Sequence, residues 1–93
     1  MLIFNNLIIS DKLKNKKKKI INALRHGEMI DPSIFVVYLN ENTSLPELMQ
    51  GYFFNQIYYH IKTIEILGIF ASKDEGIKFL SEYITESYNC DFY

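Results

Sequence analysis

The segment "DPSIFVVYLN", residues 31–40, carries the strongest strand signal in the sequence. Asp-Pro-Ser at 31–33 is a turn signature, and a continuous run of β-branched and aromatic residues follows it. A half-exposed strand alternates apolar and polar residues, so an unbroken run predicts a strand covered on both faces, as in a parallel sheet. The similar run "TIEILGIFA" at 63–71 predicts a second strand of this kind.

Each predicted strand is followed by the start signal of a helix. The Ser-x-x-Glu spacing of a capping box occurs at 44–47, with Pro46 in the first turn, and predicts a helix over residues 45–61. The same spacing returns at 72–75, and apolar residues then recur at the helical period as far as residue 88. Strand, helix, strand and helix describe a βαβα unit with a right-handed crossover.

The segment before these elements predicts a helix over residues 11–26. Asp11 or Ser10 can cap its start, Gly27 suits its end, and the apolar residues fall on one face. Residues 2–9, "LIFNNLII", fit a third strand or a turn with a short helix. We therefore expect an α/β protein with a single domain over residues 1–93. In this fold an N-terminal helix precedes a βαβα unit with a two- or three-stranded, mainly parallel sheet.

One part of the sequence resembles a known group of proteins. The segment "EILGIFASKDEGIKFLSEYI" at 65–84, with "VYLNEN" at 37–42 before it, is similar to a group of small uncharacterised bacterial α/β proteins. The resemblance covers about residues 12–88. It implies the βαβα fold and no activity.

Composition indicates how many domains the protein has and in which cellular compartment we expect it. The 93 residues are 48% hydrophobic and 23% charged, which is typical of one folded domain. Cys90 is the only cysteine, so no internal disulfide can form. The N-terminal residues lack the basic region and cleavage site of a signal peptide, and no apolar run reaches the length of a membrane span. We expect a cytoplasmic protein without a membrane partner.

A run of lysines in the first predicted helix raises the question of nucleic-acid binding. Residues 1–30 carry seven basic and two acidic residues, whereas residues 31–93 carry three and nine. However, arginine is scarce, and no aromatic residue alternates with the lysines to stack on bases. A solvated helix face therefore explains the run best, and weak, non-specific nucleic-acid binding is the alternative. The candidate basic patch consists of Lys12, Lys14, Lys18, Lys19 and Arg25.

The sequence gives little support to catalysis. In a parallel unit a site would lie after the strands, at residues 40–43 and 72–75, but turn and cap roles explain these polar residues. His26 and His60 stand at predicted helix ends, where each can bond a last-turn carbonyl. No metal-ligand spacing and no Gly-rich phosphate loop occurs. We expect no enzyme, no cofactor and no metal.

The predicted helix over 45–61 favours an interaction role because it is apolar on two sides. A surface helix ordinarily has one apolar stripe, and Tyr is typical of interfaces. We therefore expect a non-enzymatic interaction or regulatory module that forms a homodimer or binds another protein. The alternative is that all these side chains fill the protein's own core. The candidate interface residues are Tyr52, Phe53, Phe54, Ile57 and Ile61.

Overall fold

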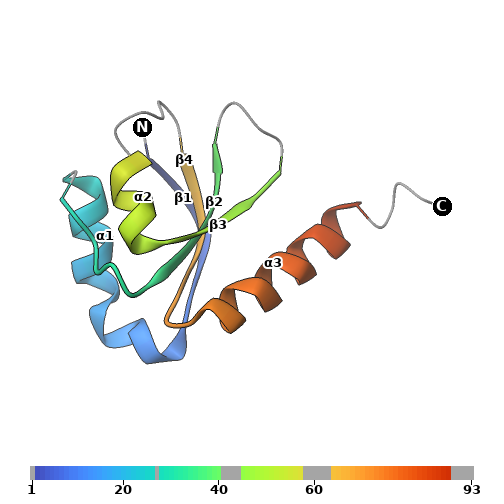
Figure 1. Cartoon of the computed structure of the whole chain (residues 1–93), viewed down its shortest axis with the longest axis horizontal. Coiled ribbons are helices and arrows are strands. Elements are labelled where there is room, and N and C mark those ends of the chain that lie inside the picture. The colour runs from blue at the N-terminus through green and yellow to red at the C-terminus, as the bar shows by residue number, and fades with distance from the viewer. Residues whose placement is uncertain (1, 27, 41–44, 58–63, 89–93) are drawn as a thin grey trace.

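A mixed four-stranded sheet with helices on both faces forms the body of the molecule (Figure 1). The computed structural model describes residues 2–26, 28–40, 45–57 and 64–88. The sheet has the strand order β1-β4-β2-β3, which confirms the α/β class. In chain order the elements are β1 (Leu2–Ile9), the 3₁₀ helix η1 (Asp11–Lys16), α1 (Lys17–Arg25), β2 (Phe35–Asn40), β3 (Glu47–Gln50), α2 (Gly51–Ile57), β4 (Ile64–Phe70) and α3 (Lys73–Tyr88).

The directions of the strands correct the predicted topology. β1 runs parallel to β4, whereas β4 and β2, and also β2 and β3, are antiparallel. The prediction of a two- or three-stranded, mainly parallel sheet is therefore wrong. The right-handed crossover is also wrong, because the segments that form β2 and β4 are antiparallel neighbours. β1 precedes the first helical segment, so the predicted N-terminal helix is not the first element, and residues 2–9 are the strand of the two alternatives.

A β-bulge explains why the apolar run in β4 need not alternate. Ile66 and Gly68 pair with the adjacent β2 residues Tyr38 and Val37, which leaves Leu67 as the extra residue. One extra residue shifts the alternation of side chains between the two faces. β4 is thus buried on both faces, as its largely apolar sequence predicts.

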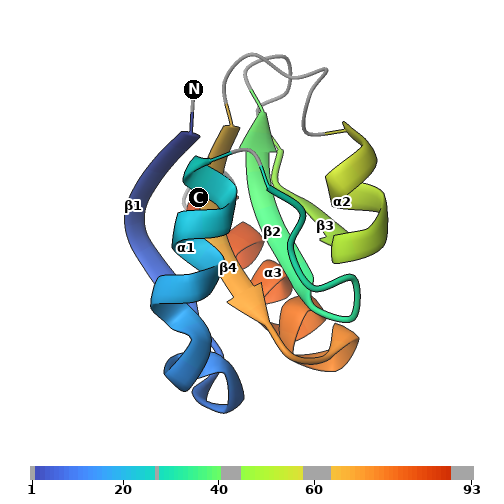
Figure 2. The same ribbon diagram turned by 90° about the vertical axis from the view of Figure 1, so that its left-hand side faces the viewer.

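The sheet separates two apolar cores. η1, α1 and α2 cover one face, while among the described elements α3 alone covers the other (Figure 2). The first core holds more buried side chains, because it has more helical cover. Its buried members are Leu13, Ile20, Leu24, Ile30, Ile34, Val36, Tyr38, Phe54, Ile64, Ile66 and Ile69. Those of the second are Val37, Leu67 and Phe70.

The helix predicted over residues 45–61 is confirmed only at 51–57, where α2 forms, and a short strand replaces its start. Residues 47–50 form β3 and pair with β2, so the first part of that prediction is wrong. Glu47 lies opposite Tyr38 in this pair and accepts a hydrogen bond from its hydroxyl at 2.7 Å. The carboxylate therefore serves a cross-strand contact instead of a helix cap. Ser44, the other half of the predicted capping box, lies outside the described residues.

A close approach between two backbone segments decides where α2 begins. The N–H of Gly51 donates to the carbonyl of Ile34 at 2.6 Å. A Cβ at Gly51 would collide with the carbonyl oxygen of Asp31. The predicted turn at 31–33 is confirmed, because the Asp31 carboxylate accepts bonds from the Ser33 N–H at 2.9 Å and hydroxyl at 2.7 Å. Glycine thus lets the first turn of α2 pack directly on this turn.

The first and last helices follow their predictions more closely. η1 and α1 together occupy nearly all of the range 11–26, although the first part is a 3₁₀ helix. α3 starts after Ser72, whose hydroxyl accepts the Glu75 N–H at 3.3 Å. The carboxylate of Glu75 accepts the Ala71 N–H at 3.1 Å, one residue before the usual capping-box donor. The predicted capping at 72–75 is therefore confirmed, whereas Gly27 lies outside the described residues.

Candidate functional site

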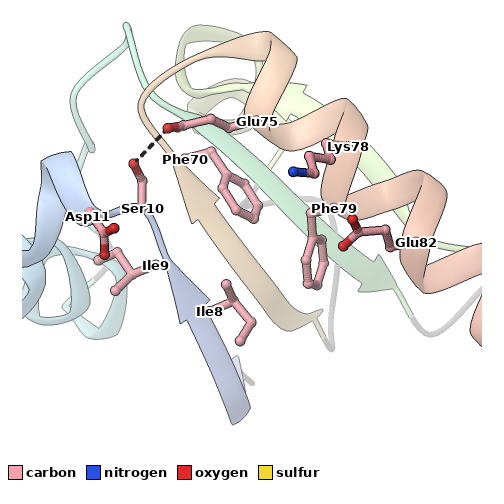
Figure 3. A pocket seen from close by; sticks show the side chains of 9 residues that line it. All are labelled: Ile8, Ile9, Ser10, Asp11, Phe70, Glu75, Lys78, Phe79 and Glu82. Atoms are coloured by element: carbon pink, nitrogen blue, oxygen red, sulfur yellow. Dashed lines mark hydrogen bonds between the residues drawn. The ribbon is translucent and has the colours of Figure 1, made fainter.

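A groove opens where the two parallel strands end, between β1, β4 and the first turns of α3 (Figure 3). Its volume is about 300 Å³. Ile8, Phe70 and Phe79 give it an apolar floor, and the rings of Phe70 and Phe79 lie 5.3 Å apart. Ligands of α/β proteins commonly bind beyond the carboxyl ends of parallel strands, which makes this groove the candidate site. The remaining lining residues are Ile9, Ser10, Asp11, Glu75, Lys78 and Glu82.

Glu75 joins the end of β1 to the start of α3. The Ser10 hydroxyl donates to its Oε1 at 3.3 Å, and the Ala71 N–H donates to Oε2 at 3.1 Å. Ser10 is only 7% exposed, and its oxygen also accepts the Lys12 N–H at 3.4 Å as the cap of η1. Helix capping thus accounts for the positions and hydrogen bonds of both the Ser10 and the Glu75 side chains. They shape the wall of the groove, and no described histidine or cysteine lines it to assist chemistry.

The charges around the groove are mainly negative. Three carboxylates, from Asp11, Glu75 and Glu82, line it together with one ammonium group, that of Lys78. Asp11 also pairs with Lys14 at 2.8 Å; this hydrogen bond, together with the lysine charge, lowers the pKa of the exposed carboxyl. The arrangement suits an apolar group that carries positive charge.

Residue 40 and the segment 72–75, which the sequence places at one site, lie at opposite ends of the sheet. Because β2 and β4 are antiparallel, residue 40 pairs with Ile64 at the start of β4, far from 72–75 at its end. Residues 41–43 lie outside the described part of the chain. The sequence predicts polar residues of a site at 72–75 but does not indicate that Ser10 lies beside them, because the pairing of β1 with β4 brings the two together. The signal that indicates this neighbourhood is the prediction that residues 2–9 form a strand, because a helix cap follows that strand directly.

The lysines of the candidate basic patch are on the solvent side, as predicted. All of its members are exposed along η1 and α1, and Lys17 is exposed as well. Two members have partners that reduce their availability. Lys14 pairs with Asp11, and the Arg25 guanidinium lies over the Phe4 ring at 5.5 Å from its centroid. The patch consists of Lys12, Lys14, Lys18, Lys19 and Arg25.

The candidate interface residues of α2 point in different directions. Tyr52 and Phe53 are 54% and 52% exposed, and their rings meet edge to face at 5.3 Å. Phe54 is 1% exposed and contacts the Tyr38 ring at 5.4 Å, so it belongs to the protein's own core. The Ile57 side chain and the whole of Ile61 lie outside the described part of the structure.

Other predicted features can be placed only in part. His26 bonds the Asn22 carbonyl through Nδ1 at 2.8 Å, as expected of a residue at a helix end. His60 and Cys90 lie outside the described residues. Among the residues that are described, no group of three or more acidic, histidine or cysteine side chains could hold a metal ion. None of the described helices combines the length and apolar character needed to cross a membrane.

Comparison with known proteins adds no relative. No protein-family model, no curated protein and no solved structure matches the chain.

Proposed function

We propose that this protein is a non-enzymatic interaction module that self-associates through an aromatic face on α2. The observation that carries this proposal is the pair Tyr52 and Phe53, two adjacent large rings that are each more than half exposed. Pro32 is exposed beside them, and its carbonyl accepts the Tyr52 N–H at 3.3 Å. Exposed aromatic side chains of this kind are enriched in protein interfaces.

The size of the aromatic face predicts a weak dimer. Each half-exposed ring leaves about 100 Å² to bury, so the four rings of a two-fold dimer bury about 400 Å². At about 25 cal/mol per Å² this burial gives roughly 10 kcal/mol of favourable free energy, before the entropic cost of association is subtracted. The loss of translational and rotational freedom costs about 4–15 kcal/mol. We therefore expect association in the micromolar range or weaker, with neighbouring residues adding to the contact.

Sedimentation equilibrium over a wide concentration range tests the proposal. The wild type should dimerise reversibly, and Tyr52→Glu and Phe53→Glu should each move the equilibrium to the monomer. Ile84→Glu is the matched control, because Ile84 is an exposed apolar residue on α3, on the other face of the sheet. A wild type that stays monomeric up to about 0.5 mM, or an equal effect of Ile84→Glu, would contradict the proposal.

A second candidate function is weak, non-specific nucleic-acid binding by the basic patch. It is favoured by the exposure of all the lysines along η1 and α1. Replacing Lys14, Lys18 and Lys19 together by Gln should then abolish electrophoretic shifts of DNA and RNA at low salt. If the wild type gives no shift at low salt, this alternative is excluded.

A further inference from the structure

The face of the sheet that carries α3 is only partly covered. Strands lie about 4.8 Å apart and a helix is about 10 Å wide, so four strands leave room for two helices on a face. The opposite face has α1 and α2, whereas α3 packs on β4, β2 and β3. Within the described residues no helix lies over β1 on the α3 side. Ile8, which points to that side, is 49% exposed as a result.

The uncovered strip is a groove with an apolar floor. Ile8 forms its β1 side, and Phe79 of α3 forms the other, with Phe70 between them (Figure 3). Phe70 is itself buried and held against Phe79, so the floor is a fixed surface. A smaller hollow of about 240 Å³, lined by Ser81, Glu82, Thr85 and Glu86, lies on the next turns of α3. An elongated ligand could therefore follow α3 beyond the groove.

The wall that α3 gives to this strip is mainly acidic, although Lys78 of α3 also lines the groove. Glu75, Glu82 and Glu86 are seven and four residues apart and lie within about 40° of one another around the helix. Lys78 is the nearest basic residue of α3 to this line. The strip thus joins an apolar floor to a row of carboxylates, which is complementary to a segment with apolar residues on one side and basic residues beside them.

We propose that the groove between β1 and α3 docks a basic amphipathic helix of a partner protein. Its apolar stripe would cover Ile8 and Phe79, and its Lys or Arg side chains would reach Glu82 and Glu86. Among the described helices, a second copy of this chain does not offer one of this kind. α3 is acidic and would meet like charge, and the apolar residues Ile20 and Leu24 of α1 are buried in their own core. The groove lies on the opposite face from Tyr52, so this site is independent of self-association.

Fluorescence anisotropy with a designed peptide tests the docking site. The probe is a labelled helix of Leu and Lys at amphipathic spacing, compared with the same peptide in which every Lys is Glu. The Lys peptide should bind with a dissociation constant of about 1–50 µM, and the Glu peptide at least about tenfold more weakly. Ile8→Asn and Glu82→Lys should each weaken the binding of the Lys peptide at least about fivefold.

Two control variants separate docking from general attraction to an acidic protein. Ile84→Asn removes an exposed apolar side chain on α3 that does not line the groove, and Glu28→Lys makes the same charge change as Glu82→Lys near α1. Both should bind the Lys peptide within about twofold of the wild type. Circular dichroism checks that each variant is folded. The proposal is overturned if the Lys peptide does not bind at about 100 µM, or if the controls weaken binding as much as Ile8→Asn does.

Discussion

The buried hydroxyl of Tyr38 offers the sharpest test of how the sheet is held together. Tyr38 is 0% exposed, and its hydroxyl donates to Glu47 Oε2 at 2.7 Å across the antiparallel pair β2–β3. The substitution Tyr38→Phe keeps the ring and its contact with Phe54 but removes the donor. Any change in stability therefore reports the hydrogen bond.

The structure sets the size of the effect at neutral pH. A hydrogen bond to a charged acceptor contributes about 1.5–3 kcal/mol. Glu47 is only half-buried, so water can partly replace the lost donor. We therefore expect Tyr38→Phe to lower the free energy of unfolding by about 1–2 kcal/mol at pH 7.

The same group makes stability fall at alkaline pH. Burial, the hydrogen bond to Glu47 and the charge of Glu47 together raise the pKa of Tyr38 well above its ordinary value of 10.0. Above pH 10 the unfolded chain releases this proton while the folded chain keeps it. The contribution of Tyr38 is therefore complete below pH 10, and above it the free energy of unfolding falls by up to about 1.4 kcal/mol per pH unit. The Tyr38→Phe variant has no hydroxyl proton to lose at this position. Above pH 10 the difference in the free energy of unfolding between the wild type and the variant should therefore decrease.

Urea unfolding followed by circular dichroism measures both effects. The free-energy difference between the wild type and Tyr38→Phe should be constant up to about pH 9.5 and should close by about pH 11. Tyr52→Phe is the control, because Tyr52 is exposed, and its difference from the wild type should stay near zero throughout. If the difference in the free energy of unfolding between the wild type and Tyr38→Phe stays constant from neutral to alkaline pH, this reasoning is wrong.

Three further substitutions test other contacts by urea unfolding. Gly51→Ala should destabilise by about 2 kcal/mol or more, because its Cβ meets the Asp31 carbonyl, and a loss below about 0.5 kcal/mol would show that the backbone adjusts freely. Glu75→Ala should cost about 1–2 kcal/mol by removing the acceptor of the Ser10 and Ala71 bonds, and an unchanged midpoint would argue against that junction. Lys17→Leu should be neutral or stabilising, since Lys17 is exposed; a loss above about 1.5 kcal/mol would indicate a specific partner for its ammonium.

The helical segment formed by η1 and α1, and the helix α3, could be predicted because their signals are local. A cap, an acidic first turn and apolar residues at the helical period lie within one segment, as at 72–88. The burial of β2 and β4 on both faces could be predicted for the same reason. Each of these properties depends on residues next to one another in the chain.

The strand at 47–50 could not be predicted from its own pattern, whereas the helix at 51–57 could. The letters Ser-x-x-Glu describe a capping box, but the partner of Glu47 is Tyr38 on the neighbouring strand. β3 has only four residues, which is too short for alternation to compete with the helical signal around it. Tertiary pairing decided between the two conformations, and nothing within 45–57 indicates that pairing.

The candidate site depends on a contact between two residues that are even farther apart in the sequence. Ser10 and Glu75 are 65 positions apart in the sequence, and they meet only because β1 runs parallel to β4. Each residue alone is accounted for as a helix cap, so neither one indicates the other. When the two strands pair, their following helices must both start at the same edge, so the two caps converge and the groove forms between them. Moving β1 to any other position in the sheet would leave both helices capped and remove the groove.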